Sequence, residues 1–158
     1  MLKRLALAAL VSALSCGASA AELAWSGGGD ELNAVLNLSE PGSIETIPLS
    51  FWCVPDIEVV YVAYAFRPAE AKDGALVDIE LSAGGITLPQ VQTSAVEIEN
   101  DHSFVLEGQI LFSEQFVALI SSPGTLTIRA EGKAAEFSLE GAKEAAVPLL
   151  KMCKARAQ

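Results

Sequence analysis

The 158-residue sequence is poor in basic side chains and in the residues that build most catalytic and metal centres. It holds 10 Lys and Arg against 20 Asp and Glu, with one histidine and three cysteines. Binding to nucleic acid requires clustered Lys and Arg that displace counterions from phosphates, so this composition argues against such a partner. A single histidine and so few cysteines supply no ligand set for zinc or copper. We therefore expect no metal and no cofactor.

Apolar segments long enough to cross a membrane are also missing. The N-terminal apolar run from Leu5 to Leu14 is about ten residues, too short for a bilayer of roughly 30 Å. Lys3 and Arg4 precede this run and Ala18-Ser19-Ala20 follows it, which is the pattern of a cleaved signal peptide. Residues 1–20 are thus predicted to be removed. The alternative is an N-terminal membrane anchor.

Lipoprotein processing at Cys16 is a second alternative for the N-terminus. The preceding residues, Ala13-Leu14-Ser15, lack the Leu-small-small pattern of a lipidation site. We therefore expect a single domain over residues 21–158, without stable membrane insertion once the signal is cleaved. Its compartment is predicted to be the periplasm of a Gram-negative bacterium, or the medium.

Charge is distributed unevenly along the mature chain. Loss of Lys3 and Arg4 takes the formal charge from −10 to −12. Residues 21–142 hold four basic and nineteen acidic residues, whereas residues 143–158 hold four basic residues and Glu144. The acidic body should repel anionic lipid and favour a cationic partner, although solubility alone also explains it.

Two cysteines, Cys53 and Cys153, remain after the signal is removed. An even pair in an oxidising compartment predicts a disulfide, and no Cys-x-x-Cys motif indicates a redox-active pair. The bond would pin the C-terminal segment to the body of the domain.

Short stretches of alternating apolar and polar residues dominate the chain, as expected of half-buried strands. Ile57–Phe66 is apolar on both faces, which is typical of a central strand covered on both sides. Turn residues separate the stretches, for example Lys72-Asp73-Gly74. The sequence predicts about eight strands, with these apolar sets facing inward: Leu32, Ala34, Leu36 and Leu38; Ile47, Leu49, Phe51 and Cys53; Val77, Ile79 and Leu81; Val96 and Ile98; Phe104, Leu106 and Ile110; Leu126 and Ile128; Phe137 and Leu139.

Helical spacing appears in two places. Ser113 is placed to cap a helix of one to two turns that ends before Ser122-Pro123-Gly124, and residues of about 141–155 predict a C-terminal helix that Pro148 kinks or restarts. The Trp25–Asp30 segment is predicted to be a flexible loop, because its glycines are not followed by the helix and Lys of a phosphate-binding loop. The fold class is mainly β: an antiparallel β-sandwich or open barrel with a C-terminal helix docked by the disulfide.

No catalytic constellation is evident. His102 adjoins Asp101 and Ser103 in a predicted turn, where neighbouring side chains diverge instead of converging on a substrate. Acidic pairs occur two residues apart on predicted strands and project in parallel. They suit a solvated face, an acid–base pair, or the docking of a basic partner. The candidate partner surface combines these acids with the best-placed exposed aromatic residue: Asp78, Glu80, Glu97, Glu99 and Trp52. Packing within the sheet is the alternative role for Trp52, and for Trp25, Tyr61 and Tyr64.

The C-terminal segment Phe137–Cys153 places a strand, a Leu-x-Gly turn and an Ala/Leu-rich helix with a cysteine in succession. This ending resembles that of small exported proteins of alphaproteobacteria that include the invasion-associated locus B family. The strand Leu49-Ser-Phe-Trp-Cys53 is similar to their earlier cysteine-bearing strand. The resemblance covers about 25 residues and implies a periplasmic β-sandwich with a helix-to-strand disulfide. The Trp-x-x-x-Cys opening and a second early cysteine pair are missing, so neither host contact nor any functional residue is transferred.

The function expected from the sequence is therefore non-catalytic. We predict an exported domain that binds a protein, such as a basic one, or a cell-envelope component. One alternative is an envelope-acting hydrolase that uses paired carboxylates as acid and base. The other is a secretion-associated immunity or inhibitor protein whose acidic loop plugs a cationic active site.

Overall fold

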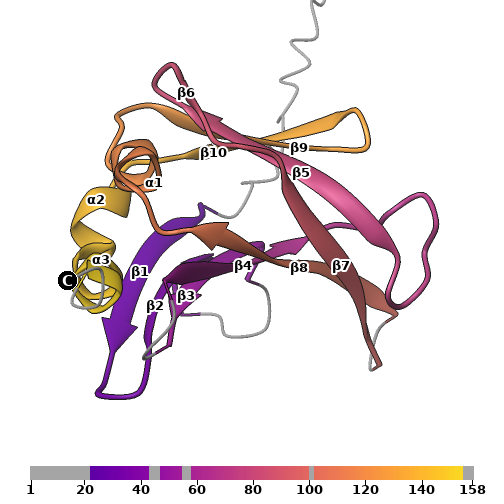
Figure 1. Cartoon of the computed structure of the whole chain (residues 1–158), viewed down its shortest axis with the longest axis horizontal. Helices are drawn as coiled ribbons and strands as arrows, with labels where there is room; N and C mark the ends of the chain where they lie inside the picture. Colours follow the sequence, from indigo (N-terminus) through magenta and orange to yellow (C-terminus); the bar gives the residue numbers. More distant parts are fainter. Residues whose placement is uncertain (1–21, 43–46, 55–57, 100–101, 155–158) are drawn as a thin grey trace, which may run out of the picture.

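The computed structural model describes residues 22–42, 47–54, 58–99 and 102–154 (Figure 1). The predicted signal peptide with its cleavage site and Cys16, and the last residue of the predicted C-terminal helix, lie outside these ranges. The described elements are, in chain order, β1 (Ala24–Gly29), β2 (Ala34–Ser39), β3 (Leu49–Cys53), β4 (Val59–Ala65), β5 (Leu76–Ala83), β6 (Ile86–Thr87), β7 (Val91–Ile98), β8 (Ser103–Leu111), α1 (Glu114–Ile120), β9 (Thr125–Ala130), β10 (Lys133–Ser138), α2 (Ala142–Ala145) and α3 (Val147–Lys154).

All ten strands belong to one antiparallel sheet, in the order β1-β2-β3-β4-β8-β7-β5-β9-β10, with β6 paired to β5. The sheet curls into a half-barrel, so the predicted mainly β class is confirmed in its open-barrel form. Figure 1 shows a lower layer of β1–β4 and β8, an upper layer of β5, β6, β9 and β10, and β7 running between them. The three helices lie at the open side of the curl.

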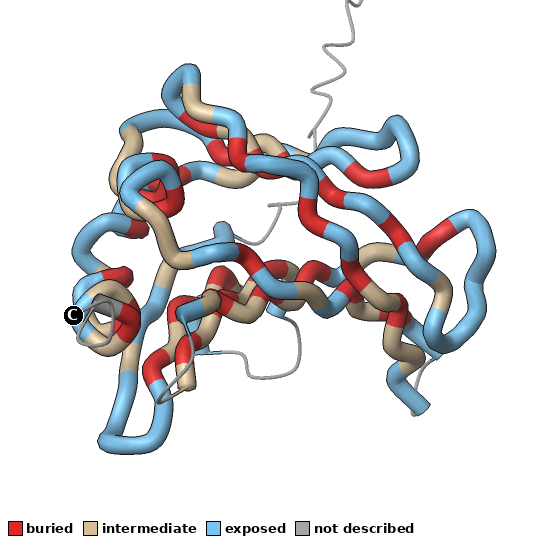
Figure 2. The backbone as a smooth tube through the Cα atoms, viewed as in Figure 1, coloured by how far each residue is buried: buried red, intermediate tan, exposed pale blue. Residues whose placement is uncertain are grey.

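The core fills the space between the two layers. Residues on the inner faces are buried, and aromatic rings from both layers meet there: Phe137 of β10 packs edge-on against Tyr64 of β4, with ring centroids 6.4 Å apart. In β2, β3 and β4 buried residues alternate with half-buried ones, whereas in β5 they alternate mostly with exposed ones (Figure 2). β5 thus shows the alternation expected of a solvated outer face, and β2, β3 and β4 do not.

The Trp25–Asp30 prediction is wrong, because Ala24–Gly29 form strand β1 at the edge of the sheet. Glycine here permits close packing instead of flexibility. A Cβ atom built on Gly27 would overlap the carbonyl group of Ala145 in α2, whereas one built on Gly28 meets nothing within 4 Å. Gly27 therefore lets the helix backbone rest directly on the strand.

The predicted inward face of β7 is also wrong. Val91, Thr93 and Ala95 face the core, while Ile98 is 39% exposed and Val96 lies on the outer face. Thr93 is buried because its hydroxyl donates to the Val77 carbonyl oxygen at 2.6 Å. This internal hydrogen bond offsets the cost of burying a polar group, so the face of β7 that carries Thr93 can turn toward the core.

The predicted inward residues of the other strands are confirmed for the most part, but three of them lie outside strands. Leu139, directly after β10, is buried, and the other two are exposed. Leu32 is 70% exposed in the turn before β2, and Ile47 is 38% exposed before β3. The extra strands beyond the predicted eight are β1 and the two-residue β6.

Candidate binding groove between α1 and α3

Helix α1 forms where its sequence provides a cap and an apolar stripe. The Ser113 hydroxyl accepts a hydrogen bond from the Phe116 amide at 3.2 Å, which satisfies one of the free N–H groups of the first turn. Phe116, Leu119 and Ile120 are fully buried against the sheet. The opposite stripe, with Val117, is left partly exposed and faces away from the core.

Two contacts hold the C-terminal helices in place. α2 rests on Gly27 as described above, and Cys153 of α3 forms a disulfide with Cys53 of β3, with Cα atoms 5.9 Å apart. Both cysteines are buried, so the predicted bond and its position between helix and sheet are confirmed. The helix restarts at Val147, next to Pro148, which agrees with the expected break.

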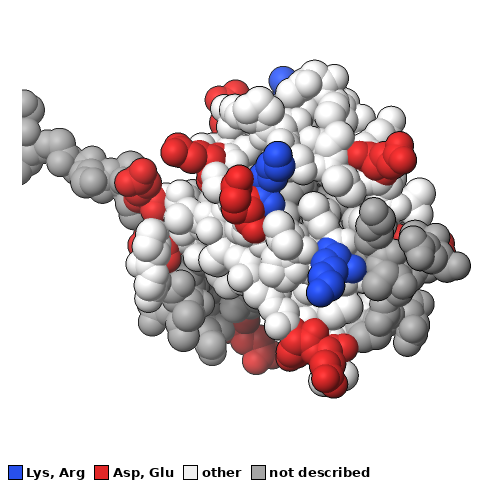
Figure 3. All heavy atoms as spheres, turned by 90° about the vertical axis from the view of Figure 1, so that its left-hand side faces the viewer, with Lys and Arg blue, Asp and Glu red and all other residues white. Residues whose placement is uncertain are grey.

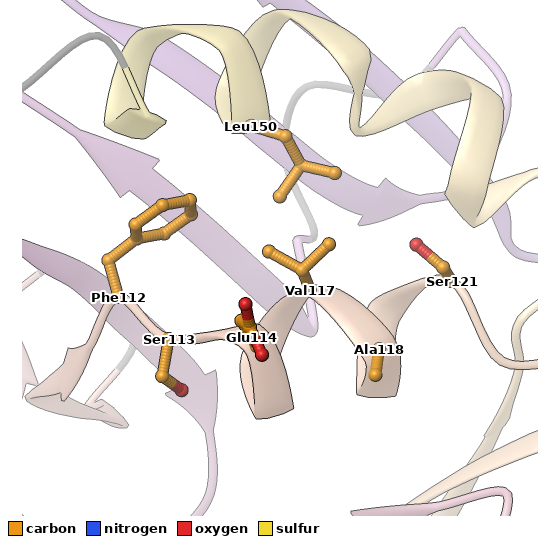
Figure 4. Close-up of a pocket in the computed structure, with 7 residues that line it drawn as sticks. All are labelled: Phe112, Ser113, Glu114, Val117, Ala118, Ser121 and Leu150. Carbon is orange, nitrogen blue, oxygen red and sulfur yellow. The ribbon is translucent and has the colours of Figure 1, made fainter. Parts of the chain in front are cut away.

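A groove of about 630 Å³ lies between α1 and α3 (Figure 4). Three apolar side chains approach one another across it: Phe112, directly after β8, Val117 from α1 and Leu150 from α3. Ala118 lies at the edge of the groove and also borders the neighbouring hollow beside β6. A hollow of this size with mainly apolar walls has the character of ligand-binding sites in proteins.

Few polar groups border this groove: Ser113, Glu114 and Ser121. The Ser113 hydroxyl is already engaged in capping α1. Glu114 is the charged residue among those that line the groove. Figure 3 shows the helix-bearing side of the molecule as a largely uncharged surface, with isolated Lys and Arg and with acidic groups around it. The groove thus has mainly apolar walls with one carboxylate, that of Glu114, at its edge.

Two groups in the described residues have a clearly displaced pKa, and neither lines the groove. The Asn33 and Leu32 amides donate to the Asp30 carboxylate, which lowers its pKa. Burial raises the pKa of the Tyr64 phenol. Both groups have structural surroundings that account for their shifts.

The predicted partner surface is divided among separate places. Asp78 and Glu80 lie on the outer face of the upper layer, where they share a shallow hollow of about 250 Å³ with Arg129 and Glu131. The Arg129 guanidinium is 3.9 Å from the Glu80 carboxylate, and Glu131 accepts a hydrogen bond from the Ala69 amide at 2.7 Å. Two of the three acids here are therefore already engaged within the protein.

Glu97 and Glu99 lie at the far end of β7. Asp78 is opposite Gln92 in the sheet, so Glu97 is five residues further along, about 17 Å away at the usual strand rise. The Glu97 carboxylate is 2.8 Å from His102 Nδ1. This contact gives His102 a partner in its own turn. Glu99 forms no ion pair with a described residue.

Trp52 lies on the outer face of the lower layer, where it stacks on Tyr61 of the neighbouring strand with ring centroids 5.3 Å apart. Tyr64 is buried on the opposite face of the same strand, as its spacing predicts. The three parts of the predicted surface are therefore not brought together.

The groove itself was not predicted from the sequence. Phe112 and Leu150 are far apart in the chain, and each fits a core position by its apolar character alone. The signal available was the exposed stripe of α1, with Val117 and Ala118 beside the capped turn at Ser113.

Within the described ranges, no group of three or more His, Cys, Asp or Glu is close enough to hold a metal ion. None of the described helices has the length and apolarity of a membrane span. Comparisons with protein-family models, with curated proteins and with solved structures gave no match to this chain.

Proposed function

We propose that the chain is a non-catalytic exported binding domain and that its groove between α1 and α3 takes an apolar part of a protein or cell-envelope component. The observation that carries this proposal is the apolar lining of the groove by Phe112, Val117 and Leu150. Binding to apolar walls of this kind is favourable, because the ligand displaces water from them.

The two helices that form the walls of the groove, α1 and α3, are both held firmly against the sheet. α1 is anchored by Phe116, Leu119 and Ile120, and the Cys53–Cys153 disulfide ties α3 to β3. A groove between anchored elements loses little conformational entropy when it binds, which favours affinity. The Glu114 carboxylate and the acidic body favour a ligand with a cationic or hydrogen-bond-donating group next to its apolar part.

Export is part of the proposal. It is supported by the signal-peptide pattern of residues 1–20 and by the disulfide, since such bonds persist in oxidising compartments. The resemblance of Phe137–Cys153 to small exported alphaproteobacterial proteins agrees with the periplasm.

Site-specific photocross-linking in a Gram-negative host tests the proposal. A photoreactive residue at Val117 points into the groove, and one at Gln115, exposed on the β6 side of the same helix, is the matched control. We expect adducts at position 117 that are weak or missing at position 115. A second substitution, Leu150→Trp, fills the groove from α3 and should suppress the adducts at position 117. Mass analysis then separates a protein from a lipid ligand. Equal labelling at both positions would refute a specific groove.

A further inference from the structure

The hairpin of β9 and β10 determines which backbone groups of β10 face away from the sheet. Glu131 and Gly132 form its two-residue turn, and both have positive φ values, 47° and 73°. In a hairpin of this kind the residues on either side of the turn, Ala130 and Lys133, exchange backbone hydrogen bonds. Every second pair along an antiparallel ladder does the same, so the residues between these pairs direct their N–H and C=O groups to the other side of the strand.

On β10 these outward-directed backbone groups belong to Ala134, Glu136 and Ser138. The Trp25 indole agrees with this assignment, because it donates from β1 to the Ser138 carbonyl oxygen at 2.7 Å. Ala134 and Glu136 are exposed, and within the part of the chain that the structure describes no hydrogen bond reaches their edge-facing groups. β10 therefore presents two consecutive donor–acceptor positions to an added strand.

The strand order fixes the direction of such an added strand. The path from β1 to β10 holds nine of the ten described strands, since β6 lies off it, and neighbours on the path are antiparallel. The two end strands therefore run in the same direction and do not continue the antiparallel ladder by pairing with each other. A strand that is antiparallel to β10 does continue it.

A hollow adjoins the end of this edge. It measures about 550 Å³, and its apolar lining includes Leu23, Leu38 and Phe137. Residues directly opposite each other in an antiparallel pair point to the same face of the sheet. The residue of the added strand that lies opposite Phe137 thus points, like Phe137, toward the hollow, and an apolar side chain fits there.

Carboxylates surround this position. Glu136 is an outward residue of β10, and Glu22 and Glu140 line the hollow. Lys133, the basic residue of β10, is directed to the Phe66 ring, 5.4 Å from its centroid. A Lys or Arg opposite Glu136 forms a cross-strand ion pair, whereas an acidic residue there is repelled. A second copy of this chain, with a mature formal charge of −12, is disfavoured for the same reason.

We propose that β10 binds an extended basic segment of a partner protein by strand addition. The segment runs antiparallel to β10, and its backbone pairs with Ala134 and Glu136. Its apolar residues face inward, toward the hollow, and alternate with Lys or Arg residues that face outward. The inference does not depend on the proposed function of the groove between α1 and α3, because none of the residues that line that groove takes part.

Amide hydrogen exchange of the mature protein, followed by NMR, tests the proposal with a capped heptapeptide of alternating Lys and Val as the probe. Its lysines lie opposite Ala134 and Glu136, so their N–H groups face β10, while its valines point inward. We expect the peptide to slow exchange at Ala134 and Glu136 in a saturable way between roughly 10 µM and 1 mM. Exchange that is slow without the peptide, or unchanged by it, would overturn the proposal.

Two methylated peptides provide a matched control. N-methylation of the two inner lysines removes donors that face β10, whereas N-methylation of two valines alters the opposite edge of the peptide. We expect the first change to weaken binding about tenfold more than the second. Equal affinities would contradict strand addition, since attraction between the basic peptide and an acidic surface would then account for binding.

Variants of the protein locate the pairing. Ala134→Pro removes an N–H that faces the free edge, so it should preserve the ladder with β9 and weaken peptide binding about tenfold or more. Glu136→Lys reverses the charge beside the added strand and should also weaken binding. Glu107→Lys makes the same charge change at an exposed position of β8 and should leave binding nearly unchanged. Folded β10 variants that bind as tightly as the unsubstituted protein would overturn the assignment.

Discussion

Gly27 of β1 lies directly against the Ala145 carbonyl of α2, so that a strand and a helix backbone meet without a side chain between them. This contact brings the C-terminal helices onto the edge strand of the half-barrel. It also positions α3, and with it Leu150, on one wall of the groove.

Gly27→Ala should therefore destabilise the fold. The added methyl group overlaps backbone atoms that cannot rotate away, so we expect a loss of about 1–3 kcal/mol in the free energy of unfolding. Gly28→Ala is the matched control, because nothing lies within 4 Å of its Cβ position, and it should change stability by less than about 0.5 kcal/mol. Urea unfolding of both variants measures the difference. Equal effects would contradict the close contact.

The disulfide should contribute to stability through the C-terminal helix. The paired replacement Cys53→Ser and Cys153→Ser opens a loop with a sequence separation of 100 residues, and we expect a cost of about 2–5 kcal/mol. Amide hydrogen exchange should show α3 losing protection before the strands. Uniform loss over the whole sheet would contradict a bond whose main role is to hold the helix.

The buried Tyr64 should make the protein less stable at alkaline pH. Its pKa is raised by burial, so above the ordinary value of about 10 the unfolded chain releases this proton more readily than the folded one. Stability should then fall as the pH rises past about 10. Tyr64→Phe keeps the ring contacts with Phe66 and Phe137 and should flatten this fall. An unchanged slope in unfolding experiments from about pH 8 to 11 would show that other groups cause it.

The two separated acidic pairs can be tested one at a time for the docking of a basic partner. Asp78→Asn with Glu80→Gln neutralises the upper-layer pair, and Glu97→Gln with Glu99→Gln neutralises the pair near His102. Whichever pair faces the partner should slow its association when neutralised and reduce the salt dependence of the rate, with the dissociation rate little changed. Stopped-flow mixing with a free basic partner, first identified by the cross-linking experiment, measures both rates. If neither pair matters, both belong to solvated surface.

Most of the sheet was predictable because its strands bury one face and alternate cleanly. Leu49, Phe51 and Cys53 are all buried on β3, and the sulfur of Cys53 points where the alternation places it. The predicted inward face of β7 was wrong because this strand carries apolar residues on both faces. The pattern favoured the larger Val96 and Ile98 over the small Ala95 and over Thr93, whose hydroxyl is satisfied inside the protein. Strand β1 was not predicted because its glycines suggested a loop. Gly27 is required by the contact with Ala145, which lies more than a hundred residues away in the chain.

The candidate site was less accessible to sequence reasoning than the fold. The apolar pattern of IEVVYVAYAF predicts a strand covered on both sides, yet Val59, Tyr61 and Ala63 are only half-buried. The apolar pattern alone does not distinguish a half-buried outer face from a covered one. The groove depends likewise on how far apart α1 and α3 lie, a distance set by Gly27 and the disulfide and by no local motif.

Titration with Nile red, a neutral apolar fluorophore, is the most direct test of the central claim that the groove between α1 and α3 binds apolar ligands. The account predicts saturable binding to the mature protein. Binding should be abolished by Val117→Trp, which fills the groove, and retained in Gln115→Trp, which adds an indole ring on the other side of α1. Absence of saturable binding, or equal binding by the two folded variants, would contradict it.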